Sequence, residues 1–304
     1  MGIRRDGLLL LDKPIGPTSH DMVDAVRGLL ETRRVGHCGT LDPMASGLLV
    51  ILAGRATKLE PYIPGDPKVY RGSVLLGIET DSMDMEGNIV SRSSYDGGKD
   101  RVEEVFQSLH GELEQVPPMY SAVKYKGKPL YKYARMGETV PRRSRKVRIY
   151  DISMEGLRHE AEGMAVDFTV SCSPGTYVRE LAYRVGYTLG CGATLRELRR
   201  VSSGPYDVRY AMSIDGLSEH VDRDSLELIG MSEAVYGLEK AVVLRDAVRA
   251  VSNGAPLSEE MVESVDNCVR KGDTVAVMSP DLQLLGFHTV VRDKPFSSRA
   301  RRII

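Results

Sequence analysis

Apolar residues along the chain fall into patterns that are typical of strands. Nearly continuous apolar runs at residues 7–11 and 47–54 have the length of strands buried on both faces. Over residues 164–172 apolar and polar side chains alternate, which is typical of a half-buried strand. Residues 68–78 also predict a strand, in which Tyr70 shares its side with aliphatic residues.

Helical periodicity separates these strands. Thr18 and Asp21 have the spacing of a capping box, and apolar residues recur at helical spacing from there to residue 30. Residues 100–110 predict a second helix, with Asp100 as its cap and Gly111 as its stop.

Two more helices are predicted before residue 210. Residues 173–176 open a helix with one apolar side, and Gly190 ends it. Thr194 and Glu197 repeat the capping-box spacing and predict a short helix. Since helices and strands interleave without a strict repeat, the sequence predicts a mixed α/β or α+β domain.

The composition changes near residue 210. An acidic helical stretch leads to Asn253 and Gly254, and residues 273–278 and 282–292 then predict a β-hairpin. This pattern suits a small β-rich C-terminal domain. The basic tail after residue 292 is a candidate for disorder.

Charge is unevenly distributed, although the formal net charge is only −1. Residues 118–148 carry ten Lys/Arg and one acidic residue, a net of +9. Residues 211–268 carry four Lys/Arg and twelve Asp/Glu, a net of −8. A solvated face would explain the basic run without a ligand. Because tyrosines are interspersed in it, the run also suits RNA, with cations on phosphates and aromatic rings on unpaired bases.

Several function classes are excluded by the composition. No apolar run approaches the roughly 18 residues of a membrane span. The four cysteines have no paired spacing, so we expect reduced thiols in a cytoplasmic protein and neither a disulfide frame nor a zinc site. Asp81, Asp84 and Glu86 do not match the register of a calcium loop and are interpreted as a hairpin turn.

Residues 34–47 combine several glycines with one acidic residue, Asp42. Glycine permits close backbone approach, and Pro43 restrains Asp42 to extended geometry. Local chemistry alone favours a simple turn here. The stretch is, however, one of six blocks that occur in order over about 205 residues. These blocks are Lys13-Pro14-x-Gly16-x-Thr18-Ser19, Gly36-His37-x-Gly39-Thr40-Leu41-Asp42-Pro43, Lys68-x-Tyr70 with Thr80-Asp81, Ser121-Ala122-x-Lys124, Gly175-Thr176-Tyr177-x-Arg179 and Leu198-Arg199-Arg200.

Together the blocks resemble the TruB family of bacterial tRNA pseudouridine-55 synthases. The resemblance implies an α+β catalytic domain over residues 1–210, with an RNA-gripping insertion at about 118–148. It implies a PUA-like RNA-binding domain with a basic tail over residues 211–304. The implied activity is isomerisation of uridine 55 in the T-loop of tRNA, without cofactor or metal. We expect a monomer whose partner is tRNA.

The resemblance also implies roles for individual residues. Asp42 is the catalytic residue. It is assigned as the nucleophile, and the alternative is a carboxylate that stabilises positive charge developing on the sugar. Arg179 is its charge partner, and Tyr70 stacks on the uracil and takes the C5 proton. From pattern alone, a buried core tyrosine and a surface arginine remain simpler explanations for Tyr70 and Arg179.

Further substrate contacts follow from the same resemblance. Tyr177 and Leu198 are walls of the base pocket, although ordinary packing explains them as well. His37 contacts substrate, and Lys13 is structural or positions RNA. The residues expected to bind RNA phosphates are Lys124, Lys126, Lys128, Lys132, Arg142 and Arg143.

Two other functions fit parts of the sequence. One is a tRNA-binding folding chaperone without essential catalysis, against which the intact set of Asp42, Tyr70 and Arg179 argues. The other is the catalytic subunit of a guide-RNA particle. Activity on tRNA without added guide would separate this last function from that of a stand-alone enzyme.

Overall fold

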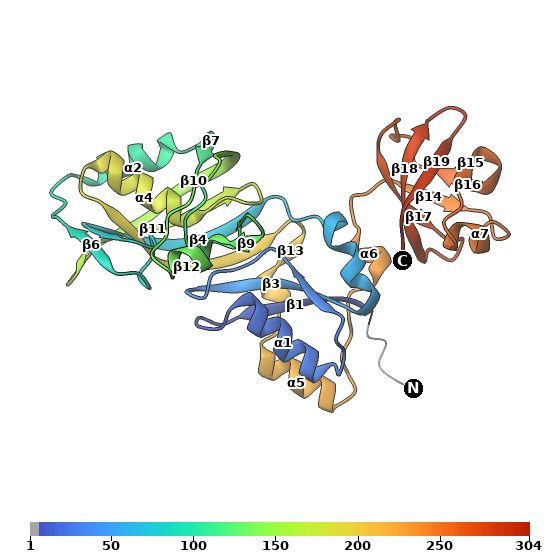
Figure 1. Ribbon diagram of the computed structural model, residues 1–304, viewed down its shortest axis with the longest axis horizontal. Helices are drawn as coiled ribbons and strands as arrows, with labels where there is room; N and C mark the ends of the chain where they lie inside the picture. The colour runs from blue at the N-terminus through green and yellow to red at the C-terminus, as the bar shows by residue number, and fades with distance from the viewer. Residues whose placement is uncertain (1–5) are drawn as a thin grey trace.

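The computed structural model describes residues 6–304, so the first five residues of the expected catalytic domain lie outside it. Figure 1 shows a larger unit with a long mixed sheet and a smaller β-rich unit beside it. The strands of the large sheet lie in the order β1 (Gly7–Lys13), β3 (Ala45–Ala53), β12 (Ala193–Ser203), β4 (Lys68–Leu76), β11 (Gly163–Cys172), β10 (Arg145–Glu160) and β7 (Gly111–Gln115). β2 (Val35–Cys38) pairs with β3, and β13 (Tyr206–Asp207) pairs with β12. The α+β prediction is confirmed.

Helices cover the sheet where the apolar periodicity predicts them. α1 (Ser19–Leu29) begins with the predicted capping box, in which Thr18 and Asp21 bond each other's backbone N–H groups. α4 (Val178–Leu189) ends at Gly190 in the left-handed conformation, as predicted. α2 (Lys99–Ser108) packs beside α4, and both contribute to a core with the central strands. The predicted cap of α2 is wrong: Gly98 is the N-cap, and Asp100 lies in the first turn.

The helix predicted from Thr194 is also wrong, because this segment is the central strand β12. It pairs antiparallel with β4 and parallel with β3. The Thr194 hydroxyl bonds the Thr80 hydroxyl at 2.9 Å instead of capping a helix. A cap contributes about 1 kcal/mol, whereas two ladders and a buried face stabilise the strand. The long-range pairing therefore overrides the local signal.

The smaller unit is a second sheet that begins at β14. Its strands lie in the order β15 (Leu257–Ser258), β19 (Ser297–Ile303), β18 (Leu284–Arg292), β17 (Thr274–Met278), β14 (Lys240–Val243) and β16 (Val262–Val265). The predicted hairpin is β17 and β18. The basic tail, expected as a candidate for disorder, is instead strand β19, which pairs with β18. Its backbone ladder holds it in place while its arginines stay at the surface.

The segment between the two sheets packs on the larger unit. α5 (Ile214–Asp222) lies against α1, and Ile229 forms a bridge with Leu8 of β1. α6 (Met231–Ala234) follows, and α7 (Val248–Ser252) covers the small sheet. The expected domain boundary at residue 210 rests on the change of composition there. The small sheet starts later, with β14 at Lys240.

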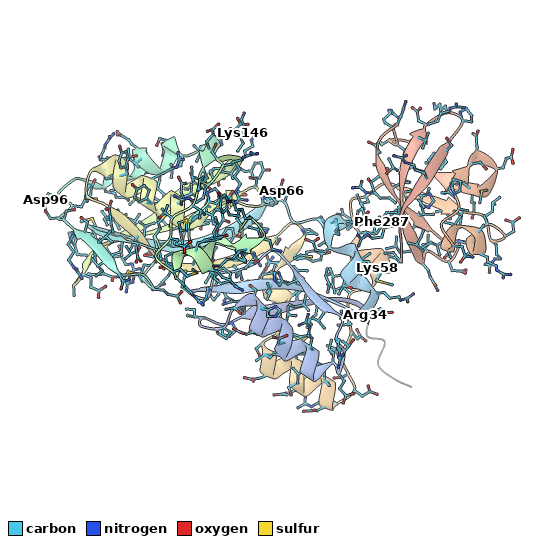
Figure 2. The ribbon with its side chains drawn as sticks, in the orientation of Figure 1. Arg34, Lys58, Asp66, Asp96, Lys146 and Phe287 are labelled. Atoms are coloured by element: carbon cyan, nitrogen blue, oxygen red, sulfur yellow. The ribbon has the colours of Figure 1, made fainter. Side chains whose placement is uncertain are left out.

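The two units meet through an apolar and aromatic contact. The 3-10 helix at Gly54–Tyr62 carries Tyr62, which stacks on Phe287 of β18 with 3.6 Å between ring centroids. Lys58 of the same helix donates to the backbone oxygen of Ile303 at 3.0 Å (Figure 2). Apolar side chains of β1, β3, β17 and β18 share one core cluster at this junction.

Gly47 is a position at which the central sheet leaves no room for a side chain. It has a φ of +102°, and an added Cβ would lie 2.2 Å from the carbonyl oxygen of Arg200 in β12. We expect Gly47→Ala to lower the free energy of unfolding by at least about 1–3 kcal/mol, measured by urea denaturation. Gly28→Ala is the matched control. A side chain at this helical position meets no neighbouring atom, and alanine should raise the free energy of unfolding by about 0.5–1 kcal/mol relative to glycine. Equal stability of the Gly47 variant and the wild type would contradict this packing.

Candidate active site

Asp42 lies on the loop between β2 and β3, and a buried lysine holds this loop on one side. Lys13 is fully buried at the end of β1. Its Nζ donates to the carbonyl oxygens of Pro14 at 2.8 Å, Pro43 at 3.3 Å and Ala45 at 2.7 Å. Burial lowers the pKa of Lys13 to about 8. Lys13 therefore fixes the backbone on the C-terminal side of Asp42, which fits the structural role expected for it.

A buried arginine holds the other side of the loop. Arg200 of β12 is fully buried. Its Nε donates to Leu48 O at 2.7 Å and its Nη2 to Gly39 O at 3.0 Å. The sequence predicted a short helix from Thr194 onward, so the position of Arg200 beneath the loop was missed. Alternation along a strand would have placed it on the same side of β12 as Leu198, which lines the site.

Helix α1 adds a third restraint to the loop. The Ser19 hydroxyl accepts from the Leu41 N–H at 2.8 Å and donates to the Leu41 carbonyl at 3.0 Å. Ser19 is the first residue of α1, so these two bonds fix Leu41, the residue before Asp42, relative to the start of the helix. The backbone around Asp42 is thus fixed by groups from three elements, β1, β12 and α1.

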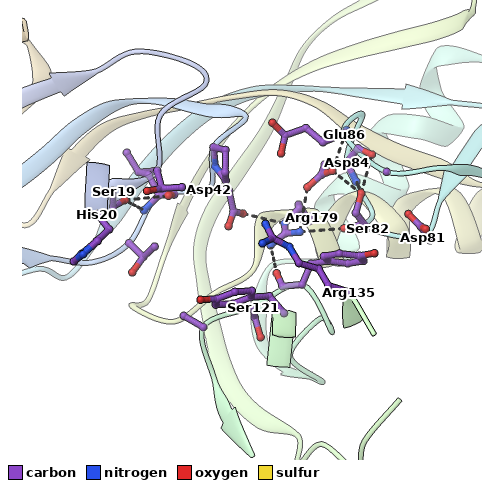
Figure 3. A pocket seen from close by; sticks show the side chains of 18 of the residues that line it. Ser19, His20, Asp42, Asp81, Ser82, Asp84, Glu86, Ser121, Arg135 and Arg179 are labelled. Carbon is purple, nitrogen blue, oxygen red and sulfur yellow. Dashed lines mark hydrogen bonds and ion pairs between the residues drawn. The ribbon is translucent and has the colours of Figure 1, made fainter. Parts of the chain in front are cut away.

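Arg179 joins Asp42 to two other segments. Its guanidinium is buried in the first turn of α4. Nε lies 2.9 Å from Asp42 Oδ2, and Nη1 lies 3.1 Å from Asp84 Oδ2. Nη2 donates to the carbonyl oxygen of Tyr120 at 2.8 Å. Figure 3 shows Arg179 between Asp42 on one side and Asp84 on the other. The simpler explanation of a surface arginine is therefore wrong.

Asp84 is a site residue that the sequence did not identify. The predicted hairpin turn is present between β5 (Ile78–Thr80) and β6 (Ile89–Arg92). Within this turn, Asp84 is buried, and its carboxylate accepts from the Ser82 hydroxyl as well as from Arg179. The turn mixes polar residues with Met83 and Met85 in no clear period, so hydropathy gives no sign that one of its acids points inward.

The charges around Asp42 act in opposite directions on its proton affinity. Burial raises the pKa of the Asp42 carboxyl, Arg179 opposes this increase, and Asp84 reinforces it. The pKa remains above the ordinary value of an aspartate. The Asp42 side chain is still 34% exposed, which leaves one face of the carboxylate open to a ligand.

Asp42 and Arg179 lie where two cavities meet. The smaller one, of about 380 Å³, is also lined by Tyr70, Tyr177 and Leu198. These three residues are the ones expected to contact the base. The larger one, of about 630 Å³, extends to His37, Glu86 and Arg135. The structure thus brings Asp42, Arg179, Tyr70, Tyr177, Leu198 and His37 to one place, while Lys13 supports the loop from behind.

Tyr70 is both a core residue and a wall of the smaller cavity. It is 7% exposed and packs in the cluster that contains Val74 and Leu76 of the same strand. Burial raises the pKa of Tyr70, and Arg200 acts in the opposite direction. The phenol is therefore neutral at neutral pH. The two explanations weighed for this residue, packing and substrate contact, are compatible.

Tyr177 and His37 are positioned by different means. Tyr177 is the N-cap residue of α4, where the buried Gln115 amide accepts from its N–H at 2.9 Å. Arg145 lies over the Tyr177 ring at 4.8 Å. His37 projects from β2, and burial lowers its pKa, so the ring is neutral.

The basic insertion forms a small hairpin and helix against the site. Its elements are β8 (Lys124–Tyr125), β9 (Lys128–Pro129) and α3 (Leu130–Ala134). Tyr131 and Arg135 line the larger cavity, so the insertion contributes directly to the site. The residues expected to bind phosphates lie at its surface or are partly buried, with Lys128 over the Tyr133 ring at 4.6 Å and Arg142 bonded to the Pro117 carbonyl.

The described residues give no sign of a metal centre or a membrane segment. Between residues 6 and 304, His, Cys, Asp and Glu side chains form no group of three or more that could hold a metal ion. In the same range, no helix is long and apolar enough to cross a membrane.

Comparisons with known proteins show the family of this chain. Residues 27–178 match the model of the TruB family pseudouridylate synthase N-terminal domain, and residues 179–243 match that of the tRNA pseudouridylate synthase B C-terminal domain. The protein named tRNA pseudouridine synthase B of Geobacter sulfurreducens is 41% identical over 85% of this chain and 84% of its own length. The Thermotoga maritima protein of the same name is 36% identical over 98% of this chain and 94% of its own length.

A solved structure shares the whole architecture. A chain in the crystal structure of a Cbf5–Nop10–Gar1 complex superposes with a TM-score of 0.75 at 28% identity, covering 98% of this chain and 85% of that one. Family models, sequence relatives and fold all lead to one assignment: the chain belongs to the TruB family of pseudouridylate synthases.

Proposed function

We propose that this protein is a stand-alone tRNA pseudouridine synthase that isomerises uridine 55 in the T-loop. The observation that carries the proposal is the Asp42 carboxylate, held against Arg179 and partly exposed where two cavities meet. The names of the relatives support tRNA as the substrate. Position 55 and the roles of individual residues rest on the family resemblance of the sequence.

The reaction needs one carboxylate and a pocket in which the base can turn. We place Asp42 as the nucleophile: its carboxylate attacks C1′, and N1 leaves with the electron pair of the glycosidic bond. The detached uracil turns between Tyr70 and Leu198, and C5 then attacks C1′ and displaces the carboxylate. Loss of the C5 proton and gain of a proton at N1 restore the conjugated ring of the base. The net result exchanges a C–N bond for a C–C bond and consumes no other reactant.

Each neighbouring group has a task in this sequence. Arg179 favours the ionised form of Asp42 and orients it, because a guanidinium is a fixed charge with directional N–H groups. Tyr70 is neutral, so it accepts the C5 proton only by passing its own phenolic proton on. His37 lies in the larger cavity, where it contacts nucleotides next to the target. The target uridine leaves the folded loop to reach Asp42, and cations of the insertion supply binding energy for this step.

The decisive experiment is to map pseudouridine in a tRNA transcript incubated with purified protein alone. Modification at position 55 without added guide or protein supports a stand-alone synthase. Activity that appears only with a guide RNA would favour a particle subunit. Binding or refolding of tRNA without any modification would favour a chaperone.

Asp42→Asn tests the nucleophile. The substitution removes the charge with little change of shape, so we expect no detectable isomerisation and nearly unchanged tRNA affinity. Single-turnover assays and a binding titration on the same preparation measure the two quantities. Pseudouridine formation at the wild-type rate would refute the assignment.

Tyr70→Phe tests whether the phenol does more than pack. The variant keeps the ring and removes the hydroxyl. If the oxygen relays the C5 proton, turnover falls by about 10²–10⁴-fold with tRNA affinity nearly intact. With 5-deuterated uridine, the kinetic isotope effect should then exceed that of the wild type. Full activity would leave Tyr70 with a packing role.

Salt dependence tests the insertion. Lys124, Lys126 and Lys132 are exposed on it. Replacing them by alanine should flatten the plot of log affinity against log salt concentration by roughly 0.7–0.9 per lost phosphate contact. The matched control replaces Arg223, Arg245 and Arg249, exposed residues of the acidic segment. Equal slopes in the two triple variants would show that the insertion is only a solvated face.

A further inference from the structure

Ser121 carries a buried hydroxyl that nothing in the described protein satisfies. The residue is 6% exposed, and its Oγ has no hydrogen-bond partner among residues 6–304. Buried hydroxyl groups are normally paired, and leaving one unpaired costs about 1–3 kcal/mol. An unpaired hydroxyl therefore points to a function that packing does not supply.

Ser121 lies at the same junction of cavities as the groups proposed to react. It lines both cavities, as Asp42 and Arg179 do. It lies at the base of the insertion, near the network drawn in Figure 3. Ser19 and Ser82 also line the larger cavity, but the Ser19 hydroxyl is bonded to the backbone of Leu41 and the Ser82 hydroxyl to Asp84.

The backbone at Ser121 is held on both sides. The carbonyl of Tyr120 accepts from Arg179 Nη2 at 2.8 Å, and the carbonyl of Ser121 accepts from the Tyr131 N–H at 3.1 Å. One bond ties this segment to the buried ion pair, and the other ties it to the insertion helix α3. The backbone that carries the hydroxyl is thus held in place, which a group needs in order to recognise a ligand.

We propose that the Ser121 hydroxyl hydrogen-bonds the ribose 2′-hydroxyl of the target nucleotide. This inference rests on the proposed function, in which Asp42 reacts at C1′. The junction of the two cavities then holds the target ribose, with the base in the smaller cavity and neighbouring nucleotides in the larger one. The 2′-hydroxyl is bonded to the carbon next to C1′, and it can both donate and accept. This contact would let the site distinguish RNA from DNA at the reacting nucleotide.

The test is a cycle of two proteins and two RNAs. The affinity of the Ser121→Ala variant is compared with that of the protein that keeps Ser121. Each protein is tested with a T-arm RNA that has uridine or 2′-deoxyuridine at the target position. Binding is measured in an Asp42→Asn background, so that no RNA is converted. We expect Ser121→Ala to weaken binding of the ribose form about 5- to 100-fold and to leave binding of the deoxy form unchanged. Equal weakening of both RNAs, or no weakening, would overturn the proposal.

Stability separates a substrate contact from a structural role. Because alanine removes a buried hydroxyl that has no partner, Ser121→Ala should unfold at or above the wild-type urea midpoint. Ser19→Ala is the matched control, since it removes two hydrogen bonds to Leu41 and should lower the midpoint. A lowered midpoint for Ser121→Ala would overturn the proposal as well. The proposed function fails separately, if the wild-type protein forms no pseudouridine in tRNA.

Discussion

The buried guanidinium of Arg179 connects the parts of this protein that must act together. It contacts Asp42 of the catalytic loop, Asp84 and Ser82 of a hairpin turn, and the backbone of Tyr120 at the insertion. Removing charges from water costs several kcal/mol per ion, so such a pair is weak evidence for stability. Its value here is geometric: one planar group sets the positions of the Asp42 carboxylate and of the insertion.

The catalytic loop is shaped by cations that leave its carboxylate free. Lys13 and Arg200 approach from opposite sides and bond backbone carbonyls. Because these cations are satisfied by carbonyl oxygens, they place positive charge near Asp42 without covering it. Two glycines of the loop allow this shape, since Gly39 has a φ of +83° and a side chain at Gly47 would collide with the backbone of Arg200 in β12.

Affinity for a polyanion is concentrated where the reaction needs it. The chain as a whole is nearly neutral, yet the insertion beside the cavities is strongly basic. The residues that face the interior of the larger cavity include Asp81, Asp84 and Glu86, which would repel phosphate. Phosphates are therefore attracted to the rim, while bases and sugars can enter. This arrangement suits a nucleotide turned out of a folded loop.

The sequence by itself determined the long elements and singled out residues that the structure brings together. Apolar periodicity placed α1, α4, β3 and β11 correctly, because those segments bury one face or both and local preference agrees with the fold. The order of the blocks identified Asp42, Tyr70 and Arg179, since a family pattern carries chemistry that no single spacing reveals.

Only the tertiary structure decided the remaining contacts. Thr194 has the spacing of a helix cap but lies in β12, which pairs with β4 and β3. One local hydrogen bond stabilises less than the backbone hydrogen bonds to two neighbouring strands. The burial of Asp84, Arg200 and Ser121 depends on segments distant in the chain that cover them. Their own neighbours in sequence are mostly polar or mixed, so no local pattern marks them. A polar group becomes buried when other segments of the chain cover it, and the fold decides which segments those are.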